Sequence, residues 1–73
     1  MKVYGYENNS DNLLELNEVT LKCSIDELDL IIEFLNVVKK EHQLYATELC
    51  HSHFQDWYKE WKSEMTDIIV VTE

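Results

Sequence analysis

The sequence lacks arginine and proline altogether, and it contains a single glycine and two cysteines. Its six lysines stand against 15 aspartates and glutamates, which gives a formal net charge of −9. Nucleic acids and anionic membrane surfaces are bound through Lys and Arg side chains. We therefore expect neither as a partner, and a basic protein is the natural electrostatic complement. The alternative is that the acidic surface serves solubility alone.

The scarcity of glycine and cysteine bears on catalysis. With Gly5 as its only glycine, the chain has no glycine-rich phosphate loop and no G-x-S-x-G motif. Cys50 and His51 are neighbours in the sequence, but adjacent residues of a strand face opposite ways, so they do not predict a nucleophile–base pair. Because no secretion signal precedes them, Cys23 and Cys50 are expected to be reduced and buried. We expect no enzyme activity and no cofactor.

Length and hydropathy predict a single folded domain over residues 1–73. Apolar residues make up 45% of the chain, far more than a disordered sequence carries. Residues 1–6 lack the apolar stretch of a signal peptide, and no wholly apolar run exceeds four residues, whereas a bilayer span needs about 20. The expected location is the cytoplasm.

Two strands are predicted before the middle of the chain. They cover residues 2–6 and 14–23, and the Asn-, Ser- and Asp-rich segment 7–12 between them indicates a chain reversal. Apolar and polar residues alternate along the second strand, but the parity changes near Asn17. We expect either a bulge at that point or a first part that faces the other side of the sheet.

A long helix is predicted to follow. Ser24 and Glu27 have the spacing of a capping box, and helical periodicity runs over residues 25–48 with a break expected near 41–43. The apolar residues of this helix spread over about 220° of its circumference, whereas a surface helix needs about 100°. Either the C-terminal segment covers the second flank, or that flank is the interface of a weak homodimer or of another partner.

The last third of the chain completes the predicted fold. Residues 49–54 form a short predicted strand, and residues 56–62 are an aromatic and charged loop or helical turn. Residues 68–71 are a β-branched run without alternation, which is typical of a strand covered on both faces. The predicted fold class is α+β in the order β-β-α-β-β, with one long helix packed on a small antiparallel or mixed sheet of about four strands.

Two groups of residues could form a site. The first is His51, His53 and Asp56, because alternate strand residues share a face and two imidazoles with a carboxylate could hold a metal. No second metal-binding motif accompanies them, so a metal is only the weaker alternative and no metal is predicted.

The second group is the aromatic and acidic segment formed by Asp56, Trp57, Tyr58 and Glu60. Trp and Tyr are enriched in binding hot spots because they bury a large area with few rotatable bonds. If the segment is helical, Trp57 and Trp61 lie on one face. We assign Trp61 to the core and predict that the other four residues bind a partner.

Several short segments also resemble a known family. They are Glu15-Leu16-x-Glu18-Val19-Thr20-Leu21, Glu27-Leu28, Phe34-Leu35, His51-x-His53-x-Gln55-Asp56, Trp61 and Asp67-Ile68-Ile69-Val70. In this order, over about residues 14–71, they resemble the small immunity proteins of bacterial polymorphic toxin systems, and specifically the immunity protein 32 family. The resemblance implies a cytoplasmic antidote that binds and blocks a toxin domain, commonly a nuclease.

The residues alone fit such a role through charge. A nuclease site is positively charged to hold phosphates, and an acidic protein can occupy it with carboxylates in their place. The alternative function is a small self-associating structural or regulatory protein without catalytic activity, and a minor metal-binding protein is a third.

Overall fold

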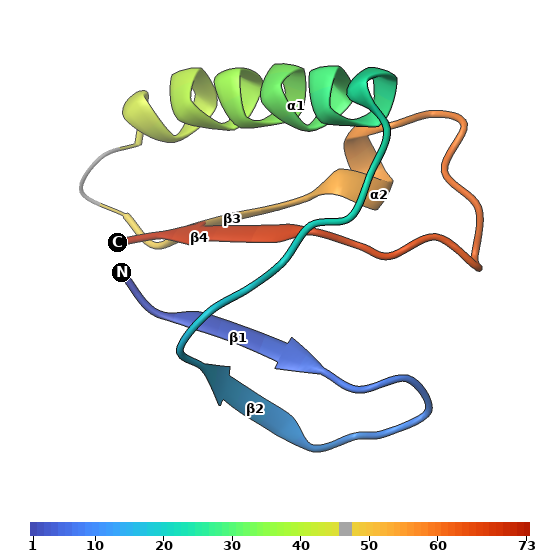
Figure 1. The fold of residues 1–73 in the computed structure, drawn as a ribbon. Helices are drawn as coiled ribbons and strands as arrows, with labels where there is room; N and C mark the ends of the chain where they lie inside the picture. Colours follow the sequence, from blue (N-terminus) through green and yellow to red (C-terminus); the bar gives the residue numbers. More distant parts are fainter. Residues whose placement is uncertain (46–47) are drawn as a thin grey trace.

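The computed structural model describes residues 1–45 and 48–73. The elements in chain order are β1 (Val3–Tyr6), β2 (Leu13–Leu16), α1 (Ile25–Gln43), β3 (Cys50–His53), α2 (Phe54–Trp57) and β4 (Ile69–Thr72). Figure 1 shows α1 on one side of the β3–β4 pair and the β1–β2 hairpin on the other. The α+β class with one long helix is therefore confirmed, and the short α2 between β3 and β4 is an addition to the predicted order.

The start of α1 is fixed by its own first turn. The backbone N–H of Glu27 donates to Ser24 Oγ at 3.1 Å, and the N–H of Ser24 donates to Glu27 Oε1 at 2.9 Å. The Ser24 backbone and side-chain hydrogen bonds lower the pKa of the Glu27 carboxyl, because they favour its charged form. The predicted capping box is confirmed. The helix ends at Gln43, so the break expected near 41–43 is also confirmed and the continuation to residue 48 is wrong.

Ser24→Ala is expected to lower the free energy of unfolding by about 1 kcal/mol, because it removes the side-chain acceptor of the first turn. Urea titration at pH 7 measures this loss.

The Glu27→Gln variant tests the second hydrogen bond of the capping box, which the Glu27 carboxylate accepts from the Ser24 N–H. The pKa of the Glu27 carboxyl is lower in the folded state than in the unfolded state. The stability that the charged carboxylate contributes is therefore fully present above the unfolded-state pKa, and it is lost as the pH falls through the folded-state pKa. Urea titrations should show the Glu27→Gln deficit at pH 7 and its disappearance at strongly acid pH. A loss of stability in Glu27→Gln that does not change with pH would contradict a stabilising role for the Glu27 charge.

The four strands do not form one sheet. β1 pairs antiparallel with β2, and β3 pairs antiparallel with β4, as two separate two-stranded sheets. The prediction of one four-stranded sheet is wrong because the strand expected over 14–23 ends at Leu16, close to the change of parity at Asn17. Val19 and Leu21, which would have continued it, are exposed.

The reversal predicted between the first two strands is confirmed. The N–H of Ser10 donates to the Glu7 carbonyl at 3.2 Å, and Asn9 takes the left-handed conformation with φ of 60°. Asparagine tolerates this conformation better than most residues, which explains its place in the turn.

The core lies between α1, α2 and one face of the β3–β4 pair. Phe34 and Val38 of α1 and Phe54 of α2 are its buried apolar residues among those described. The rings of Phe34 and Phe54 meet edge to face, with centroids 5.4 Å apart. Val70 of β4 packs against this cluster, but Ile69 and Val71 alternate with it and are exposed. The expectation that this β-branched strand is covered on both faces is therefore wrong, since α1 covers only one.

Within residues 1–45 and 48–73, no helix is long and apolar enough to cross a membrane.

Candidate functional site

A shallow hollow of about 340 Å³ lies where α1, β3 and α2 meet. Phe34, Val37 and Val38 of α1 contribute its apolar part. Its polar part comes from three elements, and the residues are Glu41, His51, Ser52, His53 and Asp56, with Trp57 beside them. We call this hollow the α1–β3 groove. It contains two of the four predicted partner-binding residues, together with both histidines of the weaker metal alternative.

The carboxylates of the groove have no cation beside them. Glu41 and Asp56 are exposed. In the described part of the chain, only two of the 15 acidic side chains have a basic side chain within 4 Å. These are Glu15, with Lys2 Nζ at 3.2 Å, and Asp67, with His53 Nδ1 at 2.7 Å. Within the described residues, Glu41 and Asp56 therefore present carboxylates that form no ion pair inside the chain.

Asp67 holds the start of α2 from the far side of a loop. Its Oδ2 lies 2.7 Å from His53 Nδ1, and its Oδ1 accepts from the N–H groups of Gln55 at 2.9 Å and Ile68 at 3.0 Å. His53, the residue before α2, makes no capping bond with its own side chain. A carboxylate 12 residues away in the sequence thus caps α2 and fixes the imidazole that borders the groove.

For the weaker metal alternative, the two histidines lie on one strand face, but they are not part of a set of metal ligands. The rings of His51 and His53 lie close, with centroids 5.6 Å apart, so the expected shared face is confirmed. However, His53 Nδ1 bonds Asp67 rather than facing Asp56. Across residues 1–45 and 48–73, no three His, Cys, Asp or Glu side chains are arranged to hold a metal ion.

The aromatic residues predicted to bind a partner also contribute to the core. The Trp57 ring lies 5.7 Å from Phe34 and 5.8 Å from Phe54, and Tyr58 lies 5.4 Å from Phe54, measured between centroids. Both Trp57 and Tyr58 are half-buried, which leaves part of each side chain accessible. Trp61 packs against the same cluster, as expected. Because α2 ends at Trp57, the two tryptophans do not share a helix face.

Glu60 lies beyond α2 and is exposed. The Tyr58 hydroxyl donates to Glu60 Oε2 at 3.4 Å. Partial burial raises the pKa of the Tyr58 phenol, and the nearby Glu60 carboxylate raises it further. The phenol therefore acts as a neutral donor that holds this carboxylate next to α2.

His42 was not among the predicted functional residues, yet it joins three elements. It is buried, with Nδ1 2.7 Å from Thr72 Oγ1 of β4 and Nε2 2.8 Å from Ser52 Oγ of β3. Both ring nitrogens are thus satisfied inside the fold, and His42 serves packing rather than binding. Its position four residues after Val38, on the buried stripe of α1, was the available sequence signal.

The two cysteines are free, as expected for reduced thiols. Cys23 is exposed and Cys50 is half-buried, so the expectation that both are buried is wrong. Cys23 lies in the segment after β2 that does not join a sheet, which explains its exposure.

No protein-family model matches this chain, and neither does any curated protein or solved structure.

Proposed function

We propose that this chain is a cytoplasmic immunity protein that binds and occludes a basic bacterial toxin domain, commonly a nuclease. The single observation that carries the proposal is the α1–β3 groove, where Glu41 and Asp56 have no cationic partner in the described residues. The resemblance of several short sequence segments to small immunity proteins supports the same role. The net charge of −9 supplies the long-range field that such a partner would meet.

The groove suits a lysine or arginine side chain of the partner. Glu41 and Asp56 offer carboxylates that can accept charge-assisted hydrogen bonds from an ammonium or a guanidinium group. The accessible part of the Trp57 indole offers an aromatic face for the same cation. Val37 is half-buried and gives the groove apolar surface against which the aliphatic stem of a basic side chain can pack.

Tyr58 and Glu60 extend the proposed contact surface along the segment that follows α2. The Tyr58 hydroxyl lies 3.4 Å from Glu60 Oε2, so the phenol and the carboxylate lie close together on this part of the surface. Asp56, Trp57, Tyr58 and Glu60 thus remain the proposed partner-binding residues, and Glu41 joins them.

Removing the two groove charges should slow association. We expect the Glu41→Gln, Asp56→Asn double variant to bind its toxin partner about tenfold more slowly, with a weaker dependence on salt. Stopped-flow fluorescence over a range of sodium chloride concentrations measures both quantities.

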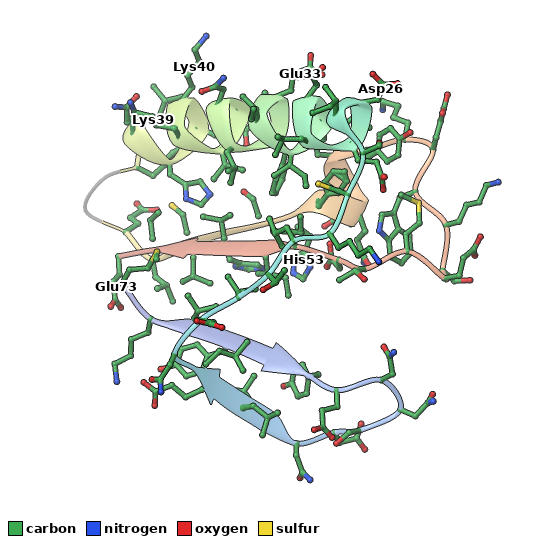
Figure 2. The ribbon with its side chains drawn as sticks, viewed as in Figure 1. Asp26, Glu33, Lys39, Lys40, His53 and Glu73 are labelled. Carbon is green, nitrogen blue, oxygen red and sulfur yellow. The ribbon has the colours of Figure 1, made fainter. Side chains whose placement is uncertain are left out.

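The matched control is Glu7→Gln, Asp11→Asn, which makes the same charge change on the exposed turn between β1 and β2. Figure 1 and Figure 2 show this hairpin on the other side of the β3–β4 pair from α1. We expect this control to change the association rate much less, because its charges are separated from the groove by that pair of strands. Equal effects of the two double variants would show that only net charge matters and would contradict the groove as the binding site.

A further inference from the structure

The chain exposes far more surface than a compact protein of its mass. Its accessible surface is 6710 Å², whereas a compact monomer of 8.7 kDa exposes about 4,700 Å². Its radius of gyration is 13.2 Å, against about 11 Å for a compact domain of 73 residues. A stable dimer needs about 800 Å² from each partner. The accessible surface in excess of a compact monomer is therefore larger than the area that such an interface buries on each partner.

Part of that excess is a continuous apolar stripe on α1. Ile25, Leu28, Ile32 and Leu35 are between 39% and 74% exposed, although each is a large apolar residue. Their spacing of three, four and three residues is that of the a and d positions of a coiled coil. The core residues of α1 lie on another flank of the helix. We call these four residues the α1 seam, and nothing in the described chain covers it.

The charges near the two ends of the seam indicate which partner would bind to it. Asp29 lies beside the N-terminal half of the seam, and Lys39 lies on the continuation of the seam beyond Leu35. A second copy in antiparallel orientation places each acidic end beside a basic end and opposes the two helix dipoles favourably. A parallel copy would place like charges together. A uniformly basic partner would match only one end, so the seam and the acidic groove suit different partners.

We propose that two copies of this chain associate through their α1 seams, antiparallel, with Ile32 at the two-fold axis. In this register Leu28 of one copy packs near Leu35 of the other. The aliphatic stem of Lys39 covers Ile25 of the other copy while its ammonium group reaches Asp29. The α1–β3 groove lies on a different flank of α1, so both grooves stay open in the dimer. The inference does not depend on the proposed toxin-binding function.

Sedimentation equilibrium from 10 to 500 µM tests the association. We expect the wild-type protein to approach twice 8.7 kDa, and the Ile32→Glu variant to remain at 8.7 kDa with unchanged circular dichroism, because Ile32 does not contribute to the core. The matched control is Val71→Glu on β4, an equally exposed apolar residue outside the seam, which should still dimerise. A monomeric wild-type protein at 500 µM, or equal weakening by both variants, would overturn the proposal.

Cysteine cross-linking tests the orientation. In a Cys23→Ser, Cys50→Ser background, Ile32→Cys should form a disulfide-linked dimer on mild oxidation, because the two copies meet at this position. Ile25→Cys should not, since in antiparallel helices the two Ile25 positions lie about 20 Å apart along the axis. Cross-linking of both would indicate a parallel pair, and cross-linking of neither would remove the seam from the interface. Either result overturns the proposed arrangement.

Discussion

Phe34→Ala is expected to lower the free energy of unfolding by about 4 kcal/mol, because it empties the centre of a very small core. Phe34 is 1% exposed, and only Val38 and Phe54 join it as buried apolar residues in the described part of the chain. Its ring also supports Phe54 at 5.4 Å and Trp57 at 5.7 Å. A domain of 73 residues has a total stability of roughly 4–11 kcal/mol, so this one change removes a large share of it.

Urea unfolding followed by tryptophan fluorescence measures the effect, since Trp57 rests on the Phe34 ring. Leu44→Ala is the control, because Leu44 is a large apolar residue just after α1 that is 77% exposed. Its replacement should change the stability by less than about 0.5 kcal/mol. A Phe34→Ala loss no larger than the Leu44→Ala loss would show that the core does not centre on Phe34.

Asp67→Ala is expected to lower the free energy of unfolding by about 1.5–3 kcal/mol, the range for removing hydrogen bonds to a charged group. The variant leaves His53 Nδ1 and the N–H groups of Gln55 and Ile68 without the carboxylate that joins them. Because these groups fix the start of α2, the loss should also disturb the groove. Asp67→Asn keeps an acceptor oxygen but not the charge, so we expect it to cost about half as much.

Chemical denaturation at pH 7 measures both variants, and Asp56→Ala serves as the matched control. Asp56 lies on α2 within the same region, but it is exposed and makes no ion pair in the described residues. Its removal should leave the free energy of unfolding within about 0.5 kcal/mol of wild type. Equal losses for Asp67→Ala and Asp56→Ala would contradict the capping role of Asp67.

The features that could be predicted from the sequence are those that depend on neighbouring residues. Ser24 and Glu27 specify the start of α1 within one turn, and the Asn- and Ser-rich segment specifies the first reversal. The alternation of His51 and His53 on one strand face was also predictable, because it follows from strand geometry alone.

The features that could not be predicted depend on contacts between distant residues. The separation into two sheets depends on where β2 ends and which strands pair, and local alternation does not set either. Asp67 caps α2 from 12 residues away, and His42 bonds Thr72 from 30 residues away. The α1–β3 groove likewise brings together Glu41 of α1 and Asp56 of α2, which are 15 residues apart in the sequence. The aromatic and acidic residues of the segment around Trp57 indicate a binding surface from the sequence alone. That Trp57 and Tyr58 also pack against the core is visible only in the structure.

Occlusion of a basic toxin domain is tested most directly by an activity titration. The purified toxin partner is mixed with increasing amounts of the chain, and the activity of the toxin on its own substrate is followed. We predict that activity falls to zero at one chain per toxin domain, that excess substrate slows the inhibition, and that the Glu41→Gln, Asp56→Asn variant inhibits more slowly. Full toxin activity in the presence of excess folded wild-type chain would contradict the proposed function.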